Sequence, residues 1–281
     1  MSGEGRSGPT SGPDPTASNP AASDPAVSDR TVSDLSHDAF LGGRLWLWQP
    51  AKGYRAATDP VLLAACVPAR DGQSVLDLGC GVGAAALCLA RRVAGLRLHG
   101  LEVQTAYAAL ARRNAAEAAI ALTVHDGDLK APPAALRHIA FDHVLANPPF
   151  FGAAQHTSAA DPGRDAAHRD GDTPLERWID AGLKRLKSGG MLTMIQRSER
   201  LPAMLGALAG RAGNTTLLPL SARAGRPAQR LILQTQKGAK GPFRLLAPLI
   251  LHSGAEHLRD AEDYTPQLQR VLRDGASLTL V

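Results

Sequence analysis

The chain reads Ser74-Val75-Leu76-Asp77-Leu78-Gly79-Cys80-Gly81-Val82-Gly83 and continues into an Ala- and Leu-rich run at 84–93. The apolar start is typical of a buried strand, and the run is typical of a helix. The three glycines between them allow a tight turn and a close approach of the backbone to a ligand. A strand, a glycine loop and a helix in this order predict the first unit of a doubly wound α/β sheet that binds a nucleotide-like cofactor.

The spacing of the glycine loop distinguishes between cofactors. Gly79, Gly81 and Gly83 form Gly-x-Gly-x-Gly, without the two-residue gap before the third glycine that the dinucleotide fingerprint has. Asp77, two residues before the first glycine, would be a poor neighbour for a pyrophosphate. S-Adenosylmethionine carries a sulfonium and an ammonium, which tolerate a carboxylate better. The loop therefore predicts S-adenosylmethionine and argues against hydride-transfer enzymes of similar topology.

Acidic residues follow the next two candidate strands. Residues 97–102 form a strand pattern that ends in Glu102, and an acid at this place accepts hydrogen bonds from ribose hydroxyls in such sheets. A helix pattern at 104–117 and a third strand at 121–125 lead to Asp128, which is placed to accept a hydrogen bond from the adenine amino group. Any one of these acids could be a solvated loop residue. Three acids at three successive strand ends predict a binding edge.

The fourth candidate strand, at 144–146, is followed by Asn147-Pro148-Pro149-Phe150, which we predict to be the catalytic residues. The Asn147 side-chain oxygen and the Pro148 carbonyl can each accept one hydrogen of a planar NH2 group, and Phe150 can stack on the ring that carries it. Such acceptors would aim the nitrogen lone pair at a methyl group and stabilise the charge that develops on nitrogen. Taken alone, the turn would more often be structural, because X-Pro-Pro is also typical of a strand end at which the chain simply turns.

Together these motifs resemble the class I S-adenosylmethionine-dependent methyltransferases that modify amino groups. The chain is similar above all to the bacterial tRNA(Val) adenine-N6 methyltransferases, which act on the adenosine just 3′ of the anticodon. The similarity runs from about Phe40 to the C-terminus. Beyond the four motifs it includes Gln49-Pro50-x-x-Gly53-Tyr54-Arg55, Thr58-Asp59-x-Val61-Leu62-Leu63, Phe151-Gly152, Arg164-Asp165-Ala166-Ala167-His168 and Pro227-Ala228-Gln229-Arg230.

The resemblance implies an enzyme that transfers a methyl group from S-adenosylmethionine to an exocyclic amino nitrogen of an RNA base, in the first place N6 of adenosine in tRNA. It also implies that Gly53, Tyr54, Arg55 and Asp59 close over the cofactor, although these residues could instead cap the sheet. Related enzymes carry Asn-Pro-Pro-Tyr more often, and guanine-N2 methyltransferases resemble this chain in having Phe at the place of Phe150. Guanine N2 of ribosomal RNA therefore stays open beside adenine.

Basic residues gather late in the chain, because no acidic residue lies between Glu199 and Glu256. A basic stripe is typical of phosphate contacts, and a solvated face is the alternative. The long irregular stretch at 151–172 directly follows the Asn-Pro-Pro-Phe turn and is predicted to grip the substrate as a lid. The candidate RNA-binding residues are Arg164 and His168 in the lid and Arg223, Arg226, Arg230, Lys237 and Lys240 in the basic stretch.

Composition bounds the remaining functions. Residues 1–36 lack aromatic side chains and are rich in Ser, Pro, Asp, Gly and Ala, which predicts a disordered tail without the pattern of a secretory signal. No run of ~18 apolar residues predicts a membrane span. Cys66, Cys80 and Cys88 show no disulfide or metal pattern, so we expect a cytoplasmic protein without metal. The net charge of +5 suits an RNA partner.

Residues 37–281 are predicted to form one methyltransferase domain with an N-terminal preface at 37–73, in which 45–48 could be a strand and 59–67 a helix. Alternating strands and helices predict a doubly wound, Rossmann-like, seven-stranded sheet. A helix at 173–187, stopped by Ser188-Gly189-Gly190, a fifth strand at 191–196 and a helix at 198–212 follow. Strands at 215–220 and 230–236 without a helix between them predict a terminal antiparallel pair.

Three other functions fit parts of the sequence. A side-chain amide also suits an Asn-Pro-Pro turn, as in the protein-glutamine N5 methyltransferases, but the basic stretch argues against a protein substrate. DNA adenine is compatible with the same turn. A fold without catalysis could bind RNA as a chaperone or regulator. Methyl transfer that depends on Asn147 would exclude an RNA-binding protein without catalysis.

Overall fold

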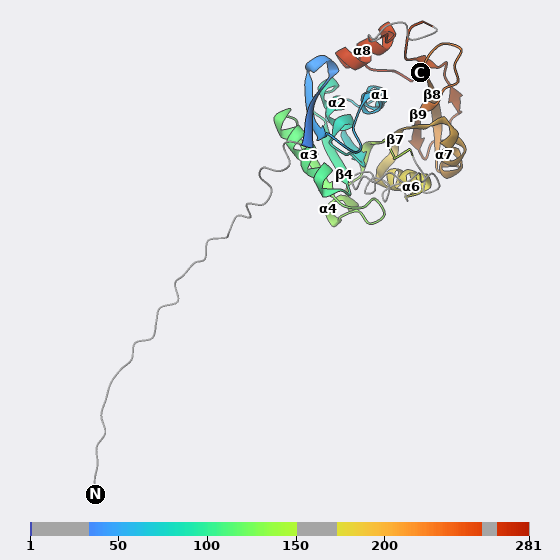
Figure 1. Ribbon diagram of the computed structural model, residues 1–281. Coiled ribbons are helices and arrows are strands. Elements are labelled where there is room, and N and C mark those ends of the chain that lie inside the picture. Colours follow the sequence, from blue (N-terminus) through green and yellow to red (C-terminus); the bar gives the residue numbers. More distant parts are fainter. Residues whose placement is uncertain (2–33, 151–172, 255–262, 281) are drawn as a thin grey trace, which may run out of the picture. The chain divides into compact units, whose positions relative to one another are not determined.

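The structure is a computed structural model that describes Met1 and residues 34–150, 173–254 and 263–280 (Figure 1). The helices are α1 (Thr58–Cys66), α2 (Ala84–Arg92), α3 (Thr105–Glu117), α4 (Ala134–Arg137), α6 (Leu175–Arg185), α7 (Leu201–Leu208) and α8 (Pro266–Asp274), with short 3-10 turns at Leu41–Gly43 and Ser198–Arg200. The strands are β1 (Leu35–Phe40), β2 (Leu45–Pro50), β3 (Ser74–Leu78), β4 (Arg97–Glu102), β5 (Leu122–Asp126), β6 (Phe141–Ala146), β7 (Leu186–Arg197), β8 (Ala212–Ser221), β9 (Arg230–Lys237), β10 (Arg244–Leu245) and β11 (Leu249–Ile250).

The central sheet has the strand order β10-β8-β9-β7-β6-β3-β4-β5, and β11 also pairs with β8. The five adjacent strands β7, β6, β3, β4 and β5 are parallel to one another. Strand β9 is antiparallel to both β7 and β8. The predicted doubly wound sheet with a terminal antiparallel pair is therefore confirmed. The two-residue strands β10 and β11, which the sequence pattern did not predict, add to the edge at β8.

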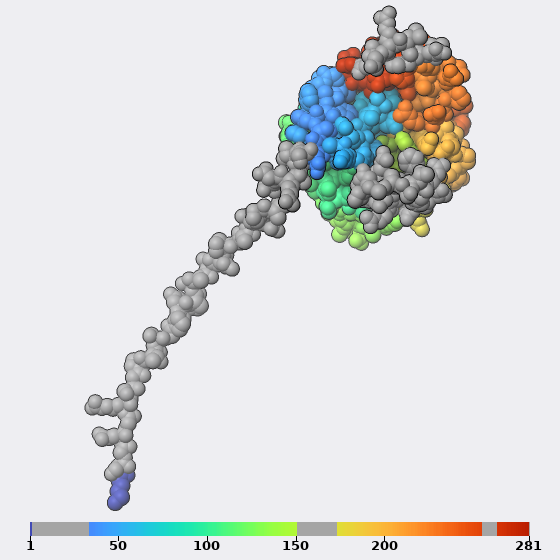
Figure 2. All heavy atoms as spheres, in the orientation of Figure 1, coloured from blue at the N-terminus to red at the C-terminus, as the bar shows by residue number. Residues whose placement is uncertain are grey.

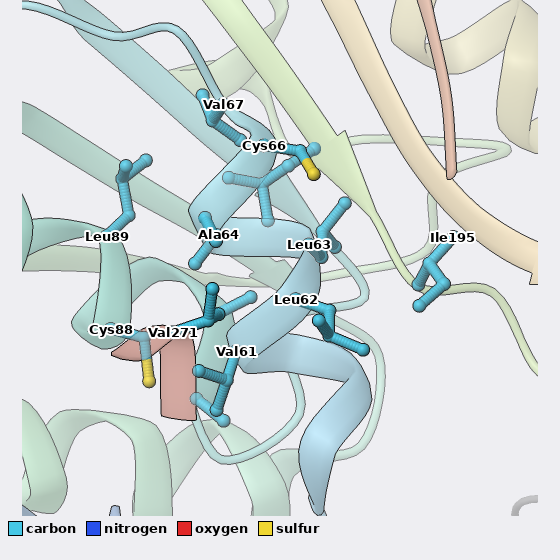
Figure 3. Close-up of a cluster of buried hydrophobic side chains, with 14 of the residues drawn as sticks. Val61, Leu62, Leu63, Ala64, Cys66, Val67, Cys88, Leu89, Ile195 and Val271 are labelled. Atoms are coloured by element: carbon cyan, nitrogen blue, oxygen red, sulfur yellow. The ribbon is translucent and has the colours of Figure 1, made fainter. Parts of the chain in front are cut away.

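Helices cover both faces of this sheet. One buried cluster contains side chains of α1, α2, α3 and α8, and a second contains side chains of α4, α6 and α7. Strand β3 is buried along its whole length, as expected where helices pack on both faces of a parallel sheet. Figure 3 shows the first cluster around α1, with Val61, Leu62 and Leu63 of α1, Leu89 of α2, Ile195 of β7 and Val271 of α8.

Strands β1 and β2 form a separate antiparallel hairpin, of which the sequence predicted only the second strand. One face of β2 is buried and the other is partly or fully exposed. The hairpin is anchored by Asn114 of α3, whose side chain is fully buried. Asn114 Oδ1 accepts a hydrogen bond from the backbone N–H of Trp48 at 2.8 Å, and its Nδ2 donates to the carbonyls of Trp48 at 3.1 Å and Val82 at 3.0 Å. A single amide thus joins the hairpin, α3 and the glycine loop.

Several predicted boundaries were wrong. Strand β7 begins at Leu186 rather than at residue 191, so Ser188-Gly189-Gly190 lies inside the strand and does not stop α6, which ends at Arg185. The pairing of β6 with β7 shifts register here, and a Cβ on Gly190 would lie 3.0 Å from the Asp142 carbonyl. The glycines therefore permit a bulge and a close approach of two strands. Helix α7 is also shorter than predicted, because β8 already begins at Ala212.

Two further findings concern the edges of the predicted domain. Strand β1 begins at Leu35, inside the stretch assigned to the tail, and α8 had no predicted counterpart.

Cys66, Cys80 and Cys88 are free and buried, and burial raises the pKa of each thiol. In the part of the chain that the structure describes, no helix is both long enough and apolar enough to cross a membrane.

We expect Asn114→Ala to lower the free energy of unfolding by about 2–4 kcal/mol, because it leaves the N–H and carbonyl of the half-buried Trp48 and the carbonyl of the buried Val82 without their partner. Urea unfolding measures the change. Thr105→Ala, at the exposed start of the same helix, should change it by less than about 0.5 kcal/mol. A loss below about 1 kcal/mol for Asn114→Ala would mean that the amide does not anchor the hairpin.

Candidate active site

A pocket opens where the carboxyl ends of β3, β4, β5 and β6 meet. The residues predicted for the site that line it are Tyr54, Asp77, Gly79, Gly81, Glu102, Asp128, Asn147 and Pro149. Gly53, Arg55, Asp59, Gly83, Pro148 and Phe150 are described by the structure but do not belong to the lining. The parallel sheet thus gathers side chains from four successive strand ends at one edge, as expected for ligand sites in this architecture.

The glycine loop folds back onto β4. The backbone N–H groups of Gly79 and Cys80 both donate to the Leu101 carbonyl, at 2.8 and 3.1 Å. Gly79, with φ of +65°, is the most constrained position, because a Cβ there would lie 2.5 Å from the Trp178 ring. Gly81 has φ of +54° and open space where its Cβ would be. The loop therefore needs glycine at Gly79 for space and at Gly81 for its backbone conformation.

Glu102 holds the loop in place. Its Oε2 accepts a hydrogen bond from the Gly81 N–H at 2.8 Å, and its Oε1 accepts one from the Gln104 N–H at 3.0 Å. The side chain is only 6% exposed. A carboxylate oxygen can accept more than one hydrogen bond. The predicted contact with ribose hydroxyls is therefore compatible with a role that the sequence did not predict, which is to join the glycine loop to the start of α3.

Asp77 is a buried acid in the wall of the pocket. Its Oδ2 accepts a hydrogen bond from the Ala86 N–H at 3.2 Å. Burial raises the pKa of Asp77 to about 8; the Ala86 N–H lowers it, and the Glu102 carboxylate raises it further. A positive charge in the pocket would favour the ionised form of Asp77. The structure thus places beside the glycine loop an acid whose charge a cationic ligand would stabilise.

Asp128 lies in the loop after β5. Its Oδ1 accepts a hydrogen bond from the Lys130 N–H at 2.8 Å, and its backbone carbonyl accepts one from Ala131 at 3.0 Å. These bonds close a turn of the kind that Asp side chains favour. The turn fixes the carboxylate at the wall of the pocket, at the place where the sequence predicts an acceptor for an adenine amino group.

The Asn147 turn is held from two sides. Asn147 Nδ2 donates to the Tyr54 hydroxyl at 3.1 Å, so the amide oxygen of Asn147 is left to accept from a ligand. The Pro148 carbonyl accepts a hydrogen bond from Gln196 Nε2 at 3.4 Å. Gln196 is 2% exposed, and its Oε1 accepts from the Arg197 N–H at 2.8 Å, which fixes the orientation of that amide.

Three predicted residues brace the pocket from outside its lining. Arg55 forms an ion pair with Asp38 of β1 at 2.7 Å, and Asp59 of α1 forms one with Arg230 of β9. Burial raises the pKa of Asp59, and the Arg230 guanidinium acts in the opposite direction. Arg55 and Asp59 follow Tyr54 closely in the chain. Their ion pairs therefore hold the segment that brings the Tyr54 hydroxyl to Asn147.

The basic stretch is not continuous in space. Arg223 pairs with Asp263, Arg230 with Asp59, and Lys237 Nζ donates to the Leu186 carbonyl at 2.7 Å. Lys237 is the last residue of β9. Because β9 is antiparallel to β7, Lys237 lies at the end of the sheet opposite the pocket, and Lys240 follows three residues later. Arg226 is exposed, in the loop that joins β8 to β9 at the same end of the sheet as the pocket. Arg164, His168 and the predicted lid at 151–172 lie outside the described residues.

The fold brings three further residues to the site that the sequence did not predict. Gln196 ends an apolar strand pattern, and a polar residue at a strand end beside the pocket was the available signal. Trp178 of α6 and Tyr107 of α3 also line the pocket, and the Tyr107 hydroxyl donates to the Tyr54 carbonyl at 3.0 Å. No local pattern marks these two aromatic residues as different from core residues. In the described part of the chain, no three His, Cys, Asp or Glu residues gather as metal ligands would.

Comparisons with known proteins place this geometry in context. Residues 57–215 match the family described as methyltransferase small domain. The tRNA1(Val) (adenine(37)-N6)-methyltransferase of Porphyromonas gingivalis is 32% identical over 172 residues, which are 58% of this chain and 67% of that protein. The enzyme of the same name from Yersinia enterocolitica is 29% identical over 193 residues, 66% of this chain and 74% of that protein.

One solved structure is similar over a larger share of the chain. It is the crystal structure of a protein from Agrobacterium tumefaciens that is described as a predicted O-methyltransferase. The TM-score is 0.63 at 26% sequence identity, and the match covers 79% of this chain and 98% of that one.

The pKa of Asp77 predicts how stability changes with pH. The folded value of about 8 lies above the ordinary value of 3.8, so the contribution of this group is fully present below about pH 4 and is lost as the pH rises towards 8. Asp77→Asn should therefore flatten the fall in unfolding free energy between these pH values. Urea unfolding of the cofactor-free protein at several pH values measures both slopes. Asp274→Asn, at an exposed residue of α8, is the control, and equal slopes for Asp77→Asn and the unsubstituted protein would contradict the assignment.

Proposed function

Because the chain belongs to the methyltransferase small domain family, we propose that it methylates an exocyclic amino nitrogen of a base in RNA. Membership confirms the expected class, an S-adenosylmethionine-dependent methyltransferase, together with its cofactor. The finer assignment that we propose is N6 of an adenosine in tRNA. It is supported by the names of the relatives and by the chemistry of the Asn147 turn.

The residues of the pocket fit this cofactor. Glu102 and Asp128 offer carboxylate oxygens for ribose hydroxyls and an adenine amino group, and Asp77 offers a negative charge near an ammonium or a sulfonium. Gly81 leaves room where a side chain would otherwise project. When bound, the cofactor supplies an electrophilic methyl carbon, whose bond to sulfur breaks as its bond to nitrogen forms.

The Asn147 turn provides what an aromatic amine needs to react. The lone pair of such a nitrogen is delocalised into the ring, so the free amine is a poor nucleophile. The Asn147 side-chain oxygen and the Pro148 carbonyl would each accept one N–H and favour a pyramidal nitrogen whose lone pair faces the methyl group. They would also stabilise the positive charge on nitrogen in the transition state. The methylated ammonium is acidic, so its proton can leave to water without a strong general base.

The observation that carries the proposal is that both acceptors are oriented before a substrate arrives. The Tyr54 hydroxyl accepts a hydrogen bond from the Asn147 side-chain NH2 group, which leaves the Asn147 side-chain oxygen for the substrate. Gln196 donates a hydrogen bond to the Pro148 carbonyl, and a carbonyl oxygen can accept a second one, which we assign to the amine. Dipoles that are fixed in this way need no reorganisation during the reaction.

An RNA partner is supported by charge. The chain has a net charge of +5 and an isoelectric point of about 9.4. Lys130 is exposed in the wall of the pocket, and Arg226 is exposed at the same end of the sheet. These two cations are candidates for phosphate contacts, and a tRNA substrate would agree with the expected cytoplasmic location. Guanine N2 and a protein amide would use the same two acceptors, so the product must distinguish them.

The test is methyl transfer from labelled S-adenosylmethionine to unmodified total tRNA, with the product nucleosides identified by mass spectrometry. We expect N6-methyladenosine. A methylated guanosine would keep the reaction and overturn the assignment to adenine. No incorporation into tRNA, with the cofactor still bound, would overturn the tRNA assignment and direct the search to ribosomal RNA, DNA and protein amides.

Asn147→Ala should reduce kcat by at least about 100-fold, because it removes an acceptor that acts in the transition state. The affinity for S-adenosylmethionine should stay within about threefold, since the carboxylates and the glycine loop remain. Single-turnover kinetics and calorimetry measure the two quantities. Near-normal turnover by this variant would show that Asn147 is not catalytic.

Gln196→Glu should lower kcat by about tenfold, because a carboxylate oxygen replaces the N–H that faces the Pro148 carbonyl. The KM for S-adenosylmethionine should change little. Gln234→Glu is the matched control, since Gln234 is also a buried glutamine and donates to the Cys66 carbonyl at 2.8 Å, away from the pocket. An equal loss of kcat in both variants would mean that Gln196 has only a structural role.

A further inference from the structure

The outer face of the β1–β2 hairpin carries a set of stacked rings, on the part of the molecule coloured blue in Figure 2. His37 of β1 lies directly opposite Trp48 of β2 in the register of the pair, and Trp46 lies diagonally from it. The His37 and Trp48 rings are parallel to within 7°, with centroids 4.3 Å apart. Trp46 meets the same His37 ring at 5.1 Å, tilted by 46°. The hairpin thus presents three rings in contact on one face.

A guanidinium extends the set. The Arg113 Cζ lies 4.0 Å from the centroid of the Trp48 ring. The Trp48 ring is therefore in contact with two further planar groups, the His37 ring and the Arg113 guanidinium. Glu117 fixes this end: its Oε2 accepts from the Trp48 Nε1–H at 2.8 Å, and its Oε1 accepts from Arg113 Nε at 2.9 Å. Trp46, His37, Trp48 and Arg113 therefore form one ordered series of planar groups, which we call the ring series.

The fold does not require these groups for its core. The buried face of β2 is made of Leu45, Leu47 and Gln49, which are at most 1% exposed. Trp46, in contrast, is 49% exposed at the open end of the ring series. A large aromatic ring at the end of an ordered stack is a surface on which a further planar group can stack.

The ring series is connected to the pocket by short paths. Six residues of α3, about 9 Å of helix, separate Tyr107 in the pocket wall from Arg113. Gln49, next to Trp48, accepts a hydrogen bond from the N–H of Ala56 at 2.7 Å, and Ala56 also lines the pocket. A strand of RNA whose target base enters the pocket would bring neighbouring nucleotides within reach of the hairpin.

We propose that the ring series binds unpaired nucleotides of the RNA that flank the methylated base, with one base stacked on Trp46. The inference rests on the proposed function. Every base has a flat π-face, and proteins that bind single-stranded RNA combine aromatic platforms with cations such as Arg113. A nucleotide also brings a phosphate to the surface of a chain with a net charge of +5, which favours RNA over an apolar protein partner.

The test is the affinity of the full chain for unmodified tRNA and for a short single-stranded RNA, measured by fluorescence anisotropy. Trp46→Ala should weaken the binding of both RNAs about tenfold, and Trp46→Phe, which keeps a ring, should restore most of the affinity. Phe243→Ala is the matched control, because Phe243 is also a half-exposed aromatic residue, at 51%, outside the hairpin. The affinity for S-adenosylmethionine should not change in any variant.

The outcomes separate this inference from the proposed function. If the unsubstituted protein methylates tRNA and Trp46→Ala binds both RNAs as tightly, the ring series is not an RNA surface and the proposed function stands. The same conclusion holds if Phe243→Ala loses as much affinity, or if Trp46→Ala only dissolves a dimer, which light scattering would detect. If the unsubstituted protein neither binds nor methylates RNA, both proposals fall.

Discussion

The pocket depends on the hydrogen bonds that the Glu102 carboxylate accepts from two backbone N–H groups. One oxygen holds the glycine loop after β3, and the other holds the start of α3. The Glu102 backbone carbonyl accepts the N–H of Gly127, after β5. A single residue at the end of β4 therefore fixes the loops that follow three neighbouring strands. The acid is buried, and the backbone N–H groups that bond to the carboxylate on both sides help to offset the cost of burying it.

How far the sequence predicts the structure depends on the range of the interactions. The elements from Ser74 to Asp126 were predicted within a residue or two, because apolar periodicity and glycine are local signals. The bulge at Ser188-Gly189-Gly190 was missed because the pairing of β7 with β6 overrides the local turn signal. The position of Lys237 could not be predicted locally either, since it follows from the antiparallel pairing of β9 with β7, which brings Lys237 to the end of the sheet opposite the pocket. Glu102 and Asn147 were found from strand ends, but their pairing with Gln104 and Tyr54 was not.

The Asn147 turn illustrates the difference between a motif and a site. The four residues supply two acceptors, but their directions are set elsewhere. Tyr54 comes from the segment after the hairpin and Gln196 from β7. Both supporting groups are neutral, so they orient the acceptors without adding a charge that would compete with the developing charge on nitrogen. The same four residues on another scaffold would lack this orientation, which is why the turn alone also suits other amine and amide substrates.

The ion pair between Asp59 and Arg230 joins residues 171 positions apart in the chain. Helix α1 receives a second late contact, from the Leu278 N–H to the Ala65 carbonyl at 2.8 Å. During synthesis on the ribosome, the segment with Tyr54 and the Asp38 partner of Arg55 emerge well before Arg230 and Leu278. The support of the pocket wall is thus completed in two stages. The ion pair of Asp59 cannot form until β9 has been made.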